Sequence, residues 1–404
     1  MAHVALGYRI SERSGMGATL ALGLLSCAGC FYLLSRTVLR EYPQLLPPLV
    51  YLYFVGWVEL LRLKPDLASK QSLWLWVATL GGICTFFLIR NTSVLEHYRS
   101  AIMLGGIGLL FSALVFGTEV NGAKLWLRVG GLSFQPIEVV KILLVVTLAS
   151  FWRRFRLWLR FSRGRVSGRL PRRGMLFLAL GWLSGLAILV LQRDLGMALL
   201  LIGVFFTMFY VATGRRDLVL LGVGAFFVAG TGAVLAFHHI RIRIRAWWDP
   251  FLFFDTDGYQ LVQGLYAIAD GGPWGRGVFL GRPYIVPEAH TDFVLTSISH
   301  ELGWIAALCV IACCADLGHF LFLLAQDCGG SFRSLLLTGL ASLWSLQCFI
   351  IIAGTTKVIP MTGITLPFVS YGGSSLLANS VLLALAVRCA RRLRPESEDV
   401  CDRT

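Results

Sequence analysis

Apolar runs of similar length, separated by shorter polar segments, follow one another along most of this chain. A membrane-spanning helix needs about 20 consecutive apolar residues, and eleven runs come close to that length. They lie near residues 16–34, 45–63, 73–89, 101–117, 137–152, 174–191, 195–213, 218–237, 293–325, 332–354 and 365–389. Because the runs are continuous rather than alternating, they predict helices and not the strands of a barrel. The expected fold is therefore an all-α polytopic integral membrane protein.

The composition agrees with this class and explains the net charge of +14. Charged residues make up 14% of the chain, whereas a soluble domain carries roughly 25%. The densest basic block runs from Arg153 to Arg173 and holds nine arginines and no acidic residue. A block of this kind between two apolar runs indicates a cytoplasmic loop. The positive charge is thus assigned to membrane orientation, and no nucleic-acid partner is expected.

Alternation of the spans from this cytoplasmic loop places residues 118–136 and 238–292 outside. The second of these is a large extracellular loop before the third-last predicted helix. The same alternation also places Arg62, Lys64 and Lys70 outside, against the usual charge bias. Two alternatives remain: the first apolar run does not span, or the charge bias fails at this turn.

The first outer loop and the helix after it carry charges near the membrane surface. Trp126 lies between Lys124 and Arg128, a combination that suits the headgroup region and can bind phosphate. Glu138 and Lys141 are spaced i, i+3 and share a helix face. They form either an internal ion pair or one wall of a cavity that opens outward.

Further candidates lie in the later outer segments. Asp194 separates two apolar runs, where it either caps the following helix or lines the same cavity. Arg243 and Arg245 belong to a cationic and aromatic strip that either anchors the loop at the interface or binds a lipid diphosphate. Lys357 adds a cation before a segment rich in proline and glycine, a composition typical of irregular backbone that lines a cavity.

The stretch from Pro287 to Phe293 is the strongest candidate for a functional site. Within it Glu288, His290 and Asp292 stand at the mouth of an apolar run. Ionisable side chains are costly at membrane depth, so such a cluster marks a functional site by default. Asp292 is the candidate reactive carboxylate, and the alternative is that it caps the next helix.

Taken together, these motifs resemble the SEDS proteins, the RodA, FtsW and SpoVE group of bacterial cell-wall polymerases. The matching residues are Asn121-Gly122-Ala123 with Trp126, Gln135-Pro136 with Glu138 and Lys141, Gln192 with Asp194-Leu195-Gly196, Gly258-Tyr259-Gln260, Pro287 through Phe293, and Leu366-Pro367-Phe368 through Ser375. They occur in the family's order from about residue 50 to about residue 390. Two positions depart from the family pattern, since Arg193 replaces a usual proline and Ile137 a usual serine.

The sequence shows no linker, low-complexity segment or obvious repeat, which predicts a single membrane domain over residues 1–404. The resemblance implies a SEDS core of ten helices at 45–390. One of the eleven runs is then extra, which makes 1–44 an N-terminal extension with a candidate extra helix and 391–404 a cytoplasmic tail. The family's essential aspartate maps onto Asp292. Its other functionally sensitive positions map onto Trp126, Glu138, Lys141 and Asp194.

The activity that the resemblance implies is peptidoglycan glycosyltransfer with inversion. Lipid II would be polymerised into an undecaprenyl-diphosphate-linked glycan at the outer face of the bacterial cytoplasmic membrane. The expected partner is a class B penicillin-binding protein, within the elongation or division complex. Asp292 would act as general base on the acceptor hydroxyl, with Glu288 and His290 in support.

The leaving diphosphate is expected to need cations, because it carries most of the developing charge. A divalent ion, Mg²⁺ or Mn²⁺, is a candidate cofactor that would add positive charge at the diphosphate. The candidate cationic side chains are Lys124, Arg128, Arg243, Arg245 and Lys357.

Two other functions fit the same charged residues. A transporter that flips lipid II would need access from both faces, whereas the polar clusters lie mainly on the outer side. A scaffold of the cell-wall machinery would use the charges only as structural pairs. Because the polar clusters lie mainly on the outer side, the enzyme is favoured over the transporter.

Overall fold

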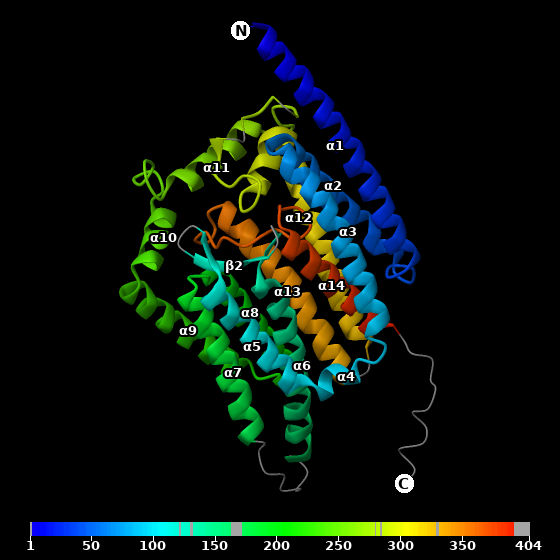
Figure 1. Cartoon of the computed structure of the whole chain (residues 1–404). Coiled ribbons are helices and arrows are strands. Elements are labelled where there is room, and N and C mark those ends of the chain that lie inside the picture. The colour runs from blue at the N-terminus through cyan, green and yellow to red at the C-terminus, as the bar shows by residue number, and fades with distance from the viewer. Residues whose placement is uncertain are drawn as a thin grey trace.

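The computed structural model of the chain describes residues 2–120, 123–129, 132–162, 172–278, 280–282, 285–328 and 331–391. Three parts of the sequence predictions lie outside these residues: Asn121 and Gly122 of the first motif, the part of the basic loop at 163–171, and the tail from 392. Within the described part, long helices form a bundle that carries a small sheet and two shorter helices at one end (Figure 1).

All eleven apolar runs coincide with long helices, as predicted. These are α1 (Ala2–Arg36), α2 (Leu46–Leu63), α3 (Pro65–Leu88), α5 (Arg99–Phe116), α6 (Pro136–Ser162), α7 (Arg172–Leu191), α8 (Leu195–Thr213), α9 (Arg216–Ala236), α12 (Val294–Asp327), α13 (Ser331–Thr355) and α14 (Gly373–Ala390). Shorter elements are η1 (Pro43–Leu45), α4 (Ser93–His97), α10 (His238–Trp248) and α11 (Tyr259–Gly271). Among the described residues, nine helices are long and apolar enough to cross a membrane. The chain is therefore a multi-pass helical membrane protein, and α10 and α11 form the predicted large loop before α12.

Helix α13 lies at the centre of the bundle. It packs against α12, α8 and α6, and 78% of its apolar stretch is buried. Helix α14 is buried to the same extent and packs mainly on α3. By contrast, 0% of the apolar stretch of α9 is buried. A helix that is apolar on its exposed surface suits contact with lipid, so α9 belongs to the periphery of the bundle.

The first outer loop folds into an antiparallel sheet. Strands β1 (Thr118–Val120), β2 (Ala123–Val129) and β3 (Leu132–Phe134) pair in the order β1-β2-β3. The all-α class holds for the membrane part, but the sequence prediction missed this sheet. Charged or aromatic residues alternate with leucines from Lys124 to Arg128, and that alternation is the signal of a strand.

Two helices depart from the continuous apolar runs that predicted them. Helix α14 begins at Gly373 and not near residue 365, because the backbone before it is irregular and Phe368 has a positive φ of 63°. Helix α12 is interrupted at Gly303 (φ 85°), where an added Cβ atom would meet the backbone of Pro273. Glycine alone tolerates that approach at positive φ. Hydropathy therefore marks the spans but not these backbone breaks.

The turn between α2 and α3 lies at the same end of the bundle as the sheet, α10 and α11 (Figure 1). Helix α6 ends and α7 begins at the opposite end. Helix α1 is long and apolar enough to span, so the structure supports a failure of the charge bias at Arg62 and Lys64. Both cations have local partners: Arg62 pairs with Glu301, and Lys64 Nζ lies 3.4 Å from His290 Nε2.

Candidate active site

A tight turn presents Asp292 immediately before α12. The N–H groups of Thr291 and Phe293 donate to the Glu288 carbonyl at 3.1 and 3.2 Å. Glu288 itself adopts a left-handed backbone at φ 52°, which is uncommon for a residue other than glycine. The turn thus places the side chain of Asp292 by backbone hydrogen bonds.

The same turn is fastened to the irregular segment before α14. Ser370 Oγ donates to the Thr291 carbonyl at 2.6 Å, and the Tyr371 N–H donates to the His290 carbonyl at 2.9 Å. Two chain segments that are far apart in the sequence therefore hold Asp292 between them.

Asp292 does not cap α12. The residue that precedes the helix is Phe293, and no described residue donates a hydrogen bond to the Asp292 carboxylate. Asp194 does cap its helix, because the Met197 N–H donates to Asp194 Oδ1 at 3.1 Å. The predicted cap is thus present at Asp194 and absent at Asp292, which leaves the Asp292 carboxylate available to a ligand.

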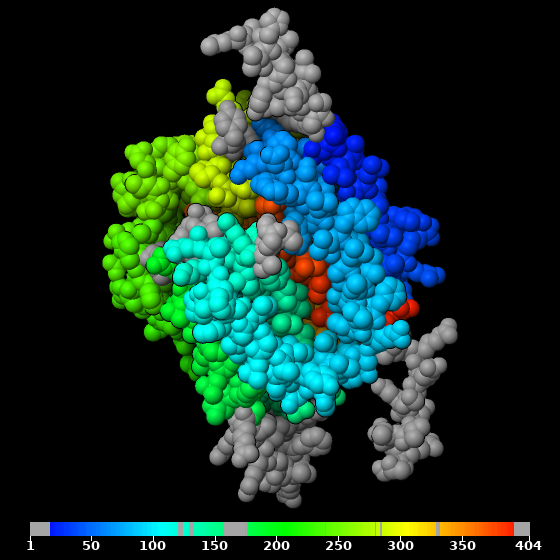
Figure 2. All heavy atoms as spheres, viewed as in Figure 1, coloured from blue at the N-terminus to red at the C-terminus, as the bar shows by residue number. Residues whose placement is uncertain are grey.

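The Asp292 side chain lines a cavity of about 400 Å³. Seven of the predicted site residues line this cavity: Trp126, Arg128, Asp194, Arg243, Glu288, His290 and Asp292. They come from β2, the α7–α8 turn, α10 and the turn before α12. Figure 2 shows a hollow beside this region, between α3 and the cyan β2–α5 segment, with the red α14 at its floor.

Both carboxylates of the cavity have raised pKa values. Burial raises the pKa of Asp292 to about 7, and the negative charge of Glu288 adds to this effect while Arg243 opposes it. Burial also raises the pKa of Asp194 to about 6, against the hydrogen bond from Met197. A general base works best when its pKa lies near the operating pH. Asp292, which has no hydrogen-bond donor among the described residues, fits that role better than Asp194.

His290 lines the cavity beside Glu288. Burial lowers its pKa, and the nearby charge of Lys64 lowers it further. Its Nε2 lies 3.8 Å from Glu288 Oε2, whereas Thr291 Oγ1 donates to the same carboxylate oxygen at 3.0 Å. His290 is therefore a neutral neighbour at pH 7 and not a second cation.

Glu138 and Lys141 form an internal ion pair. Both side chains are buried in α6, with Lys141 Nζ 2.5 Å from Glu138 Oε2 and 2.7 Å from Gln347 Oε1. Gln347 of α13 in turn donates to the Thr365 carbonyl at 2.9 Å. Thr365 lines the cavity, so the pair supports the cavity from behind and is not part of its wall.

The predicted cations divide into two groups. Arg128 and Arg243 line the cavity. Lys124 and Arg245 are exposed and do not line it. Lys357 is also outside the lining, and its carbonyl accepts a hydrogen bond from Trp247 Nε1 at 3.0 Å.

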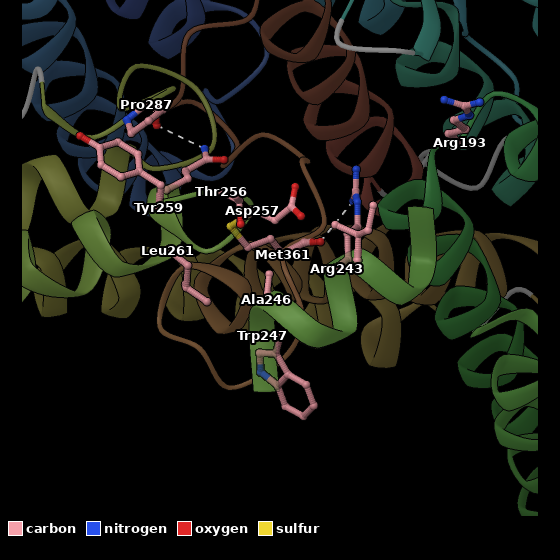
Figure 3. A pocket seen from close by; sticks show the side chains of 12 residues that line it. Arg193, Arg243, Ala246, Trp247, Thr256, Asp257, Tyr259, Leu261, Pro287 and Met361 are labelled. Carbon is pink, nitrogen blue, oxygen red and sulfur yellow. Dashed lines mark hydrogen bonds between the residues drawn. The ribbon is translucent and has the colours of Figure 1, made fainter. Parts of the chain in front are cut away.

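The structure contains a second cavity of about 540 Å³, whose lining residues are drawn in Figure 3. Arg193 and Arg243 line both cavities. Sequence reasoning did not count Arg193 among the site residues, although its cationic side chain beside Asp194 had been noted as a departure from the family pattern. Lys64 was also missed, because its approach to His290 depends on packing between distant segments.

The described residues contain no group of three or more His, Cys, Asp or Glu side chains that could hold a metal ion. Asp194 and Asp292 nevertheless line the same cavity. Mg²⁺ is commonly held by one or two carboxylates together with phosphate oxygens, so a carboxylate of this cavity such as Asp194 suits an ion that arrives with a diphosphate.

The chain is similar to a family of cell cycle proteins. The FtsW/RodA/SpoVE family model matches residues 48–394. The peptidoglycan glycosyltransferase RodA of Mycobacterium leprae (strain TN) is 38% identical over 374 residues, which cover 87% of this chain and 78% of the relative. The probable peptidoglycan glycosyltransferase FtsW of Bacillus subtilis (strain 168) is 31% identical over 296 residues, which cover 70% of each chain.

Solved structures show the same likeness. One, described as structural coordination of polymerization and crosslinking by a peptidoglycan synthase complex, has a TM-score of 0.72 at 27% identity. The rod shape determining protein RodA of Thermus thermophilus has a TM-score of 0.61 at 27% identity. Each comparison covers 86% of this chain and 96% of the solved one.

Proposed function

The chain belongs to the FtsW/RodA/SpoVE family and is a peptidoglycan glycosyltransferase; from this premise we propose that it polymerises lipid II with Asp292 as general base. The observation that carries the proposal is the Asp292 carboxylate itself. It lines a cavity with three arginines, makes no hydrogen bond to any described residue, and has a pKa of about 7.

The proposed step moves one proton and exchanges one bond. Asp292 takes the proton from the 4-hydroxyl of the acceptor sugar, and the oxygen attacks the anomeric carbon of the growing chain. The bond from that carbon to the diphosphate oxygen breaks, and undecaprenyl diphosphate leaves with the electron pair. Attack opposite to the leaving group inverts the anomeric configuration. A positioned base supplies roughly 10²–10⁴-fold, so other groups must supply the rest.

The second requirement is that the negative charge on the leaving diphosphate is stabilised. Arg128 and Arg243 line the cavity, and a guanidinium can hold phosphate oxygens with two parallel hydrogen bonds. Preorganised cations of this kind stabilise charge where it develops. A Mg²⁺ or Mn²⁺ ion held by Asp194, which lines the cavity next to Arg193, would supply additional positive charge to the diphosphate.

The proposed location of the reaction is the outer face of the bacterial cytoplasmic membrane. The elements that line the cavity, among them β2 and α10, lie at the end of the bundle opposite the adjoining ends of α6 and α7 (Figure 1). Those ends carry arginines such as Arg153, Arg154 and Arg172, which favour the cytoplasmic side. A cavity confined to the opposite end supports an enzyme over a lipid II transporter, which needs access from both faces.

The proposed partner is a class B penicillin-binding protein within the elongation or division complex. The solved synthase complex that this chain resembles combines polymerization with crosslinking. A transpeptidase bound to this chain would crosslink the glycan that the chain produces.

Polymerisation of labelled lipid II by the purified chain with its partner tests the function. The partner carries a disabled transpeptidase serine, so that only glycan growth is measured. We expect long glycans from the wild type and at least roughly 100-fold slower polymerisation by Asp292→Asn, which keeps the shape but removes the base. Asp66→Asn, at an exposed site outside both cavities, is the matched control and should behave as wild type.

Normal polymerisation by Asp292→Asn would keep the enzyme but place the base elsewhere. No polymer from the wild type in an intact complex would contradict the glycosyltransferase, and a lipid flipping assay would then follow.

A further inference from the structure

Two cavities meet at Arg193 and Arg243, and we propose that they are paired substrate sites of the polymerase. The acceptor sugar occupies the cavity beside Asp292. The donor glycan occupies the neighbouring cavity between α10 and α11, and its diphosphate lies at the two arginines between them. This inference rests on the proposed function and adds to it a second site and a new binding residue, Arg193.

The wall between the cavities is built from Arg243 and the segment before α14. Arg243 Nη1 donates to the carbonyls of Met361 and Thr362 at 3.2 and 3.4 Å. Met361 lines the second cavity, whereas Thr362 and Gly363 line the first. Figure 3 shows Arg243 beside Met361, with the hydrogen bond between them drawn. Arg243 therefore stands at the boundary and is held there by backbone carbonyls.

Arg193 reaches the same boundary from the α7–α8 turn. Its backbone has a φ of 61°, and a residue with a Cβ atom adopts that region only at a cost. The next residue is Asp194, whose carboxylate caps α8 and lines the first cavity. The turn thus places one carboxylate in the first cavity and one guanidinium at the junction of both.

The second cavity has the lining expected of a sugar site. Trp247 and Tyr259 supply aromatic surface, and Asp257 and Gln260 supply polar groups. Ligand pockets typically combine apolar and aromatic walls with a few such polar groups. Gln260 Nε2 also donates to the Pro287 carbonyl at 3.2 Å. A ligand in this cavity therefore lies beside the stretch that carries Asp292.

The arrangement fits the bond exchange of the reaction. The acceptor hydroxyl loses its proton to Asp292 on one side of the boundary, and its oxygen bonds to the donor's anomeric carbon. The electron pair of the broken bond leaves on the diphosphate oxygen, which the two guanidinium groups hold. The base and the leaving-group site are then on opposite sides of the reacting carbon, as inversion requires.

Binding of a short prenyl diphosphate to the full chain with its partner, in discs of zwitterionic lipid, tests the arginines. Loss of one charge-assisted contact should weaken binding by roughly tenfold or more. We expect this for Arg193→Gln and Arg243→Gln. Arg245→Gln is the matched control, because Arg245 lies two residues further along α10 but lines neither cavity. Its affinity should equal that of the wild type.

The backbone at Arg193 needs a separate control. Glycine adopts a φ of 61° without cost, so Arg193→Gly removes the side chain while favouring the native turn. It should fold well and still bind the prenyl diphosphate weakly, whereas Arg193→Lys should retain most of the affinity.

A lipid II analogue whose 4-hydroxyl is blocked can act only as donor. Its binding therefore tests which of the two cavities is the donor site. Truncation of the second cavity by Tyr259→Ala should raise the Kd for this lipid, and truncation of the first cavity by Trp126→Ala should leave the Kd unchanged. The opposite pattern would overturn the assignment of the donor site.

Two further results would overturn the inference and leave the proposed function standing. The first is wild-type affinity in Arg193→Gln and Arg243→Gln, when the wild type polymerises lipid II. The second is displacement of the prenyl diphosphate by phosphatidylglycerol, which would make the arginines a lipid headgroup site. Failure of the wild type to polymerise lipid II would instead contradict the proposed function.

Discussion

Two aspartates in one cavity differ in what touches them. Asp194 accepts the Met197 N–H and so is oriented as a helix cap. Asp292 accepts no hydrogen bond from the described residues, and its charged form is opposed by burial and by Glu288. A carboxylate without a fixed partner can accept a proton from a ligand without first breaking a bond within the protein. This difference supports the proposal that Asp292 is the base.

The pH dependence of polymerisation should report this base. Because the raised pKa of Asp292 is about 7, the active carboxylate is present above pH 7 and is lost as the pH falls through that value. We expect the rate to rise between about pH 6 and pH 8. Removal of a negative neighbour by Glu288→Gln lowers the pKa of Asp292, so the acid limb should shift to lower pH. A rate profile with the same acid limb in both proteins would contradict this account.

Helices α6 and α13 are tied together by a buried polar chain that reaches the cavity. Lys141 contacts Glu138 and Gln347, and Gln347 contacts the Thr365 carbonyl. Removing one member of a buried ion pair leaves an uncompensated charge, which is more costly than removing both.

The stability of the bundle should therefore depend on the Glu138–Lys141 pair as a unit. We expect Lys141→Met to destabilise the fold by roughly 3–5 kcal/mol, and the double variant Glu138→Gln/Lys141→Met to recover part of that loss. Thermal unfolding in detergent measures both. Arg215→Gln, at the exposed pair with Asp217, is the control and should not change the midpoint. Equal losses in the single and double variants would argue against a coupled pair.

At the scale of elements, hydropathy predicted the helices but not the structure of the segments between them. The sheet at β1–β3 was missed because a strand of seven residues, Ala123–Val129, gives a weak signal beside long apolar runs. The late start of α14 at Gly373 depends on contacts of the segment before it, such as Ser370 with Thr291. Contacts between distant segments leave no periodic pattern in the sequence.

The whole molecule extends beyond the part that matches the family. The family model begins at residue 48, after α1, and α1 packs on α3 and α2. Trp76 Nε1 donates to Ser26 Oγ at 3.2 Å, and Gly23 lies directly against the Trp57 ring. Helix α1 lines neither cavity.

Removal of α1 should therefore lower the stability of the protein and leave its turnover unchanged. A chain that starts at residue 41 loses the contacts of α1 with α2 and α3, so its thermal unfolding midpoint should fall. Its rate of lipid II polymerisation per folded molecule should equal that of the full chain, because both cavities are retained. A folded truncation with strongly reduced turnover would show that α1 contributes to the active site.

Much of the site was also predictable at this scale, with clear limits. Seven predicted residues meet in one cavity, because their motifs lie at segment ends on one side of the membrane. Arg243 and Arg245 are two residues apart in the sequence, yet only Arg243 lines the cavities. The rotation of α10 decides between them, and that rotation is set by tertiary packing. The role of Arg193 required the second cavity, which no motif reveals.

The wall shared by the two cavities has a consequence for inhibitor design. Consider a compound with one fragment for each cavity, joined by an anionic link that passes Arg243. Once its first fragment is bound, the second fragment binds its cavity as an intramolecular step. A short flexible link gives an effective concentration on the order of millimolar, so two weak fragments can combine into a tight ligand. Such a compound would exclude donor and acceptor together and would therefore compete with both substrates.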